Sequence, residues 1–557
     1  MSSTLVVGDL WTGLLALGAA IVLTASYVLA DLLALLWRQY FSPLQRLRGP
    51  PSPSFLFGNL REMYNQENTG LLYDWDATYG STYAYKGFFG GPRLQTMDLT
   101  AVAHILSHSD AYQKPNFVRD NLAAMGAGSE SVLTTEGEVH RRQVRFFFPL
   151  QRNVKRLTPV FRDKASELRD VWIGLSSKDQ SKPIDVLMWL SRATLDVIGI
   201  AGFGYRFNAL SGQSDELANA YHLIFATAKK LQLRTILETW IPLLRKFRVH
   251  SEVMDKAHHH LICIGLQLIN ERKTTINHVS ARRCWDDERD YSELSPPEPD
   301  LLSVLVRSNM ASFASQRLTT PEVLCQISTF LIAGYETSSS ALTWCLYALA
   351  ICGRQFAPSL WILRHWMKIL SKLEYLDWVV RETLRFHAPV TWTMRVAMED
   401  DEIPVQQPFW DKHGELNRTI KIAKHDIITI PIQAINKSYS IWGQDAHIFR
   451  PERWKNPPES SKAIQGLYSN ILTFLSGNRG CIGYRFALAE IKMFLFTLIR
   501  DLEFTVEPAV IIEKTFNVVA RPVEKSRYNS VNKMPLFIRP IPSISASSSR
   551  TNDPNET

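Results

Sequence analysis

An uncharged run of 21 residues, 10–30, lies close to the start of the sequence. A helix of that length spans about 30 Å, which is the thickness of the hydrocarbon core of a bilayer. Two aspartates bracket the run, Arg38 and Arg46 follow it, and no basic residue precedes it. Because the basic flank of a span stays in the cytosol, the pattern predicts a transmembrane anchor over 10–30 with residues 1–9 in the lumen. A cleaved signal peptide is the alternative, but a basic segment ahead of the apolar run is missing.

The rest of the sequence divides into three parts. Residues 31–53 form a linker that ends in a proline-rich hinge, 49–53, because prolines exclude helix and favour an extended path. Residues 54–540 contain no internal repeat and no second long linker, which predicts one large domain. The last stretch, 541–557, is rich in Ser, Asn and Thr and is expected to be a disordered tail.

Composition excludes several classes of protein. Of the 557 residues, 46% are apolar and 21% charged, which is typical of a folded globular chain rather than a disordered or fibrous one. The net charge of +8 is mild for this length and does not indicate nucleic-acid binding. Six cysteines without a Cys-x-x-Cys pair predict neither a disulfide scaffold nor a structural zinc site.

Helical periodicity dominates the body, and strand-like stretches are short. Two examples of such stretches are 82–85 and 427–430. A polar, charged segment at 273–300 predicts a surface loop. The fold class expected from the sequence is therefore mainly α with a minor β-sheet region.

One long helix is predicted from Thr319 to about Gly353. Thr319 can cap it, and Glu322 completes a capping box three residues later. Small and polar residues interrupt its apolar pattern around Gly334, Glu336 and Thr337. Small side chains open room beside the backbone, so this break predicts a groove for a small ligand, with an acid and an alcohol to deliver protons.

A single cysteine stands in a loop of unusual composition. The string Phe-x-x-Gly-x-Arg-x-Cys-x-Gly covers residues 474–483 and precedes an apolar helix expected from Tyr484 to about Arg500. Glycines bring backbone N–H groups near the Cys481 sulfur, and the helix N-terminus follows, so both should stabilise a thiolate. With Phe474 as an apolar wall and Arg479 as a cation, the loop suits an iron porphyrin whose iron is bound by sulfur.

At this point the chain resembles the cytochrome P-450 family of heme-thiolate monooxygenases, in particular its fungal microsomal members. The resemblance covers nearly the whole length and rests on motifs in the expected order. These are the anchor with its proline hinge, Ala-Gly-Tyr-Glu-Thr at 333–337, Glu-x-x-Arg at 382–385, Pro-Glu-Arg-Trp at 451–454 and the cysteine loop at 474–483.

The resemblance implies a cytochrome P-450 fold with heme b as cofactor. Cys481 would be the axial iron ligand, and its thiolate would favour O–O cleavage. Thr337 would hydrogen-bond the iron-bound oxygen, Glu336 would help to bring protons, and Gly334 would give dioxygen its space. The same resemblance makes Glu382, Arg385 and Arg453 a buried charge network beside the heme.

Further cofactor contacts follow from the same resemblance. Arg479 and Arg395 would bind heme propionates, and His140 occupies the place of a Trp or His beside the heme. The family usually carries an arginine four residues later, where this chain has Val144. The interval from Thr337 to Glu382 is also shorter than the resemblance leads us to expect, and residues 351–373 are rich in tryptophan and poor in acids.

The substrate and partners expected from the resemblance are as follows. Apolar side chains in the substrate-contacting regions predict a lipophilic small molecule, by analogy a terpenoid or polyketide of fungal secondary metabolism. Those side chains are Phe117, Met125, Phe225, Leu231, Trp240, Pro389, Val390, Trp392 and Met394. Electrons would come from a membrane-bound NADPH-cytochrome P-450 reductase, with dioxygen as co-substrate and no nucleic-acid partner. The catalytic domain would lie on the cytosolic side of the endoplasmic reticulum membrane.

Three functions remain open on the sequence alone. The first is a monooxygenase that inserts one oxygen atom into a C–H bond. The second is a heme-thiolate isomerase or dehydratase that needs no reductase, and the Glu336–Thr337 pair favours the first over it because such enzymes need no proton relay. The third is an inactive relative that acts only in binding, which Val144 and the short interval would allow.

Overall fold

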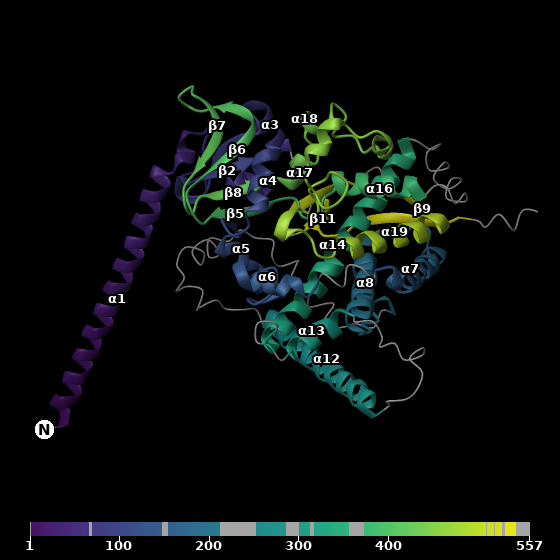
Figure 1. Ribbon diagram of the computed structural model, residues 1–557, viewed down its shortest axis with the longest axis horizontal. Helices are drawn as coiled ribbons and strands as arrows, with labels where there is room; N and C mark the ends of the chain where they lie inside the picture. The colour runs from purple at the N-terminus through teal and green to yellow at the C-terminus, as the bar shows by residue number, and fades with distance from the viewer. Residues whose placement is uncertain are drawn as a thin grey trace, which may run out of the picture.

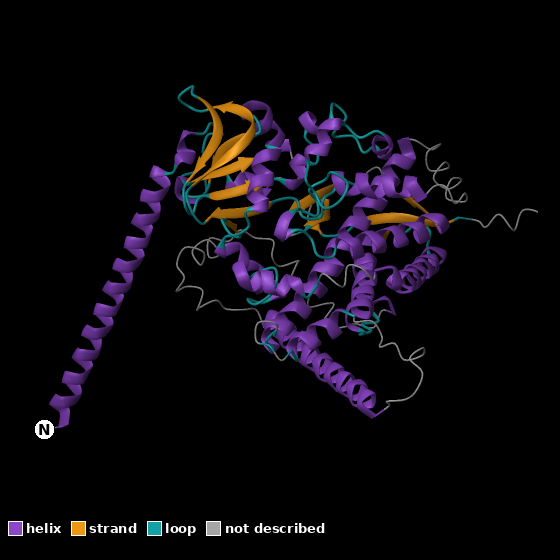
Figure 2. Ribbon diagram, in the orientation of Figure 1, coloured by secondary structure: helices purple, strands orange, loops and turns teal. Residues whose placement is uncertain are grey.

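The computed structural model describes residues 2–65, 70–147, 154–211, 252–285, 300–311, 313, 317–355, 373–507, 510–516, 519–525 and 530–541. Helices dominate, and the strands are short (Figure 2). The predicted fold class, mainly α with a minor β region, is confirmed. Phe225, Leu231, Trp240 and the tail from residue 542 onward lie outside the described residues.

Helix α1 (Ser2–Phe41) opens the chain and projects away from the body (Figure 1). It contains a 24-residue apolar span, Gly18–Phe41, with a mean hydropathy of 2.1 and no buried residue. The helix continues past Ala30 because neither proline nor glycine interrupts the chain before Phe41. The structure thus extends helix into the predicted linker 31–53, and a short 3₁₀ helix, η1 (Pro43–Arg46), follows.

The helices of the body surround a long central helix, α14. In chain order they are α2 (Leu60–Asn65), α3 (Gly70–Tyr79), α4 (Leu99–Ser107), α5 (Asn116–Leu122), α6 (Gly137–Arg145), α7 (Thr158–Lys178), α8 (Val186–Ile198), α12 (Glu252–Trp285), α13 (Leu301–Asn309), α14 (Thr320–Gln355), α16 (Leu373–Phe386), α17 (Ile432–Ile435), α18 (Tyr439–Trp442) and α19 (Tyr484–Asp501). The loop predicted over 273–300 is wrong for its first part, because α12 runs to Trp285. Hydrophobic periodicity does not mark that end of α12, since a helix can be polar on most faces.

The capping box predicted at the start of α14 is present. The Thr319 backbone N–H donates to Glu322 Oε2 at 2.8 Å, and the Glu322 N–H donates to Thr319 Oγ1 at 3.2 Å. The helix then contacts α8, α12, α13, α16, α19 and the strand β11. Its polar break is therefore enclosed by the body on several sides.

Strands form four sheets within the part of the chain that the structure describes. They are β1 (Thr82–Lys86), β2 (Pro92–Thr96), β3 (Tyr112–Gln113), β4 (Ile184–Asp185), β5 (Thr393–Ala397), β6 (Asp401–Trp410), β7 (Leu416–Ile422), β8 (Ile427–Ile430), β9 (Leu502–Thr505), β10 (Ile512–Phe516), β11 (Ala520–Lys525), β12 (Ser530–Val531) and β13 (Pro535–Pro540). The largest sheet has the order β1-β2-β8-β5-β3, with β2 and β8 parallel and its other pairs antiparallel. Both strands predicted from the sequence lie in it, as β1 and β8. The other sheets are β10-β11-β12, β4-β13-β9 and β6-β7.

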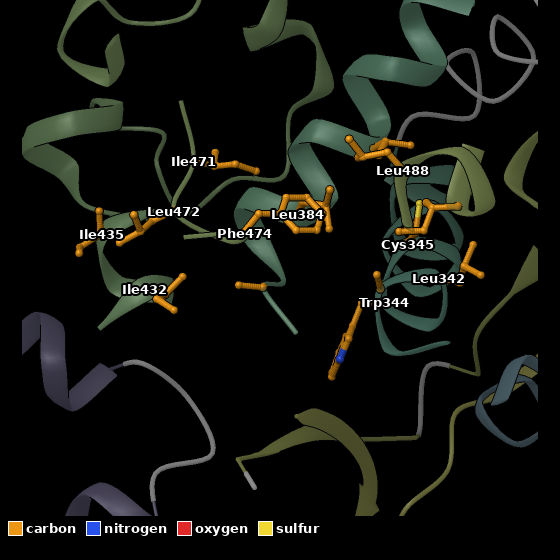
Figure 3. Packing of buried hydrophobic residues seen from close by; sticks show 14 of the residues in the cluster. Leu342, Trp344, Cys345, Leu384, Ile432, Ile435, Ile471, Leu472, Phe474 and Leu488 are labelled. Carbon is orange, nitrogen blue, oxygen red and sulfur yellow. The ribbon is translucent and has the colours of Figure 1, made fainter. Parts of the chain in front are cut away.

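One large hydrophobic cluster draws its members from Leu44 to Ile538. Figure 3 shows part of it, with Trp344 and Cys345 of α14, Leu384 of α16 and Phe474 ahead of α19. Segments far apart in sequence therefore share one core. This shared core fixes the cysteine loop relative to α14 and α16.

Candidate functional site

The cysteine loop is held in a strained backbone path between residues 474 and 483. Leu475 and Gly477 have φ values of 55° and 63°, and a Cβ on Gly477 would lie 2.4 Å from the Leu106 carbonyl oxygen. The Cys481 N–H donates to the Phe474 carbonyl at 2.9 Å, which closes the loop. Helix α19 begins at Tyr484, as predicted, so the cysteine lies just ahead of a helix N-terminus.

The Cys481 side chain is both accessible and closely surrounded by protein. It retains surface that a water-sized molecule can reach, yet burial raises the pKa of its thiol to about 11. The Gly483 N–H opposes this rise but does not offset it. The loop therefore acts in the predicted direction, although desolvation outweighs it; that Cys481 binds iron as a thiolate stays a prediction. A bound metal cation would deprotonate such a thiol.

Two predicted cations, Arg395 and Arg479, are buried. Arg395 on β5 is 1% exposed, and its Nη1 donates to Thr393 Oγ1 and the Met394 carbonyl, both at 2.7 Å. Its Nη2 is buried without a hydrogen-bond partner. Arg479 has a side-chain exposure of 5%; it forms an ion pair with Glu136 and donates to the Thr135 carbonyl at 2.9 Å. Burial lowers the pKa of both guanidinium groups to about 10.

His140 lies on α6 and is buried, as the prediction of a site beside the cofactor requires. Burial and the nearby Lys114 ammonium lower its pKa to about 4, so the ring is neutral at pH 7. Val144, one turn later on α6, packs against a second hydrophobic cluster, whose buried members include Leu195 of α8, Leu305 of α13 and Tyr335 of α14.

Lys114 is a cation that the sequence reasoning missed. Its Nζ donates to the Leu133 carbonyl at 3.0 Å, and burial together with Arg479 and Arg395 lowers its pKa well below the usual range. Lysine beside Pro115 carries no sequence signal of such a role. Position 144, where the family usually carries an arginine, is valine in this chain. Lys114 instead supplies a basic side chain near Arg395 and Arg479.

The polar break of α14 carries the predicted acid and alcohol side by side. The Thr337 hydroxyl donates to the Ala333 carbonyl at 2.6 Å, a bond within the helix. Glu336 is 1% exposed, and both of its oxygens bind Arg521 on β11, at 2.5 and 2.6 Å. No motif marks this arginine, which lies 185 positions away along the chain.

Gly334 lies on the face of α14 that meets α8. A Cβ at this position would lie 2.9 Å from Ile198 Cγ1. Close packing of the two helices is thus sufficient to explain the glycine. Its predicted role in making room for dioxygen stays a prediction.

The predicted charge network is present, and all of its members are buried. Arg385 binds Glu382 through Nε at 2.9 Å and Nη2 at 2.8 Å, and Arg453 Nε reaches Glu382 Oε1 at 3.0 Å. Trp454 Nε1 and the Arg450 N–H also donate to this carboxylate, at 3.1 and 2.8 Å. Two arginines and two further donors thus fix the end of α16 against the segment that follows β8.

This set of residues fits an iron porphyrin. Cys481 offers one soft sulfur ligand with accessible surface, and in the described ranges no group of three His, Cys, Asp or Glu side chains is placed to hold a metal ion by itself. Buried cations are costly without counter-charges. Lys114, Arg395 and Arg479 outnumber the Glu136 carboxylate that pairs with one of them, so the site suits a ligand with more than one negative charge.

Comparison with known proteins agrees with this geometry. The family model described as Cytochrome P450 matches residues 48–351 and 364–528. Cytochrome P450 monooxygenase 205 of Postia placenta (strain ATCC 44394 / Madison 698-R) is 40% identical over 520 residues, which cover 90% of this chain and 94% of the relative. Cytochrome P450 monooxygenase 128 of the same fungus is 38% identical, over 94% of this chain and 97% of the relative. Cytochrome P450 monooxygenase claP of Ampulloclitocybe clavipes is 31% identical, over 89% and 93%.

The match to the family is interrupted at one place. Residues 352–363 fall between the two matched ranges. This gap lies inside the segment 351–373, whose length and composition depart from the expected pattern. The residues that the structure describes also have a gap there, between 355 and 373.

Proposed function

The chain belongs to the cytochrome P450 family, whose fungal monooxygenases it resembles over nearly its whole length, and from this premise we propose that it oxidises a lipophilic small molecule. The reaction proposed is insertion of one oxygen atom from dioxygen into a C–H bond, with electrons that derive from NADPH. The observation that carries the proposal is the accessible Cys481 thiol in the loop just ahead of α19, with the buried Arg479 two residues away.

Heme b is the proposed cofactor. Cys481 would bind the iron, and Lys114, Arg395 and Arg479 would bind the propionates. Phe474 is buried beside the loop and would pack against the porphyrin edge. When bound, the heme supplies oxygen activation, which a thiolate ligand promotes. Neutral His140 would donate a hydrogen bond rather than add a charge.

A lipophilic substrate is supported by the apolar residues around α14. Met125 packs against the second hydrophobic cluster, which includes Tyr335 of α14, and Phe330 of the same helix packs against it too. Trp392 is 41% exposed on the segment that follows α16. Because binding pockets for drug-sized ligands are mostly apolar with few polar groups, these residues suit a terpenoid or polyketide of secondary metabolism.

The electron donor proposed is a membrane-bound NADPH-cytochrome P450 reductase. Arg485 is exposed one turn from Cys481, and Lys492 on the same helix pairs with Asp377 at 2.5 Å. A basic rim of this kind attracts an acidic partner face. The apolar span in α1 supports anchoring in the endoplasmic reticulum membrane with the catalytic body in the cytosol.

A reductase-independent isomerase or dehydratase is the second candidate. One observation favours it: the Glu336 carboxylate is already paired with Arg521, and the Thr337 hydroxyl is already bonded within its helix. Such an enzyme would form product without NADPH. The turnover experiment below separates the two.

The first experiment tests the thiolate. Full-length protein reduced with dithionite and exposed to carbon monoxide should show the red-shifted Soret band of thiolate-bound heme. Cys481→Ser should lose this band, whereas Cys263→Ser, at an exposed cysteine of α12, should keep it. An unshifted band in the wild-type chain would refute the heme-thiolate assignment.

The second experiment tests the reaction. The chain is coexpressed with a reductase and supplied with terpenoid and polyketide precursors, and products are analysed by mass spectrometry. A gain of one oxygen that depends on NADPH supports the monooxygenase. Product of unchanged oxygen count that forms without NADPH supports the second candidate instead.

A further inference from the structure

The C-terminal hairpin β10–β11 lies against the polar break of α14. The Ala520 carbonyl at the start of β11 accepts from Ser340 Oγ at 2.8 Å and from Trp344 Nε1 at 3.3 Å. The Ala520 N–H donates to the Pro389 carbonyl at 2.8 Å, on the segment that leads to Arg395. Ala520 therefore ties β11 both to α14 and to the chain that carries a proposed propionate ligand.

The next residue of β11 reaches the acid of that break. Arg521 Nε and Nη2 donate to the two oxygens of Glu336, and the two side chains are 4% and 1% exposed. Two parallel bonds between a guanidinium and a carboxylate fix both distance and orientation. The nearby Glu336 charge outweighs desolvation and raises the pKa of Arg521, so this cation stays charged.

The pair determines what Glu336 can do. With Arg521 present, both Glu336 oxygens are occupied and the side chain is screened from solvent. A proton relay at the adjacent Thr337 depends on the orientation of this acid, because a proton donor or acceptor must lie within hydrogen-bond reach.

We propose that Arg521 is a positioning residue that holds the Glu336 carboxylate in one orientation on α14, next to Thr337 in sequence, and so controls proton delivery at the active site. This inference rests on the proposed monooxygenase function. It assigns a role to the C-terminal hairpin: the same strand that Ala520 ties to the Pro389 segment sets the orientation of the acid on α14.

The test uses the full-length protein with heme and measures how fast dioxygen reoxidises the reduced protein. The reaction is followed by stopped-flow absorbance between pH 6 and 9. Arg521→Met should accelerate reoxidation at least threefold at pH 7, because the Glu336 carboxylate is then no longer held by the guanidinium and can move toward Thr337. Arg521→Lys, which keeps the charge, should stay within twofold of wild type.

A matched control lies on the same strand. Lys525 forms a pair with Glu513 but is 53% exposed, so Lys525→Met should leave the rate and its pH profile unchanged. In the Glu336→Gln background, Arg521→Met should have less than a twofold effect. The proposal is overturned if Arg521→Met matches wild type at every pH, or if its effect persists in that background.

A second readout does not depend on activity. Urea unfolding is measured for wild type, Arg521→Met, Glu336→Gln and the double variant. The four unfolding constants together give the coupling between Arg521 and Glu336. A tenfold or larger coupling in the unfolding constant, about 1.4 kcal/mol, is expected, and a coupling below twofold overturns the pairing. If Arg521→Met does not fold, Arg521→Gln replaces it with the same expected and opposing results.

The outcomes also separate this inference from the proposed function. A wild-type chain that lacks the red-shifted carbon monoxide band refutes the function, whatever the variants do. A normal band together with unchanged reoxidation in Arg521→Met refutes only the role of Arg521.

Discussion

Glu490 on α19 should make the stability of this protein fall as the pH rises. Its side chain is fully buried, and burial raises the pKa of its carboxyl to about 8 from 4.5, although the Ser338 hydroxyl on α14 acts in the opposite direction. The folded chain therefore holds a proton that the unfolded chain releases above pH 4.5. Replacing Glu490 with glutamine, which has the same shape but does not titrate, should remove this dependence.

The size of the effect follows from linkage between proton binding and folding. Where the folded state binds one proton more than the unfolded state, stability falls by at most about 1.4 kcal/mol per pH unit. Over the window from pH 4.5 to about 8 the total would be on the order of 5 kcal/mol, as an upper bound. From pH 5.5 to pH 7.5, the free energy of unfolding of wild type should fall by roughly 2–3 kcal/mol relative to that of Glu490→Gln.

The assay is urea unfolding of the full-length protein in detergent, followed by tryptophan fluorescence at each half pH unit from 5 to 8.5. The quantity compared is the free energy of unfolding of Glu490→Gln minus that of wild type, so that other titrating groups cancel. This difference should increase with pH. Glu459→Gln serves as control, because Glu459 has a side-chain exposure of 84% and should give a flat difference.

Parallel pH curves for wild type and Glu490→Gln would refute the reasoning. They would mean that the Glu490 carboxyl ionises in the folded protein as easily as in the unfolded chain. A difference that decreases with pH would contradict the sign of the argument directly.

Three further outcomes are expected from the same unfolding measurement. Glu382→Gln should lower the free energy of unfolding by about 3–5 kcal/mol, because it removes the anion that faces two buried arginines, and a loss no larger than that of Glu459→Gln would contradict this. Thr319→Ala should cost about 1 kcal/mol through loss of the helix cap; no change would mean that water replaces the cap. Burial lowers the pKa of Lys437 to about 7, so wild type should gain stability relative to Lys437→Met as the pH rises from 7 to 10, and a flat difference would show that this ammonium is solvated.

Local features of this protein could be predicted from the sequence. The capping box at Thr319 and Glu322, the start of α19 just after Cys481 and the strand at 427–430 depend on neighbouring residues and on short-range periodicity. The charge network of Glu382, Arg385 and Arg453 was expected from motif resemblance, and the structure brings its members together.

The tertiary structure decided the state of the charges in the site. Arg521 binds Glu336 across 185 positions of sequence, and Lys114 joins Arg395 and Arg479 although no motif marks it. Burial also raises the pKa of the Cys481 thiol, against the effect of the Gly483 N–H. The physical reason is that desolvation and Coulomb interaction depend on distances in space. The order of residues therefore determines which groups are available, and packing determines which of them carry charge and toward what they point.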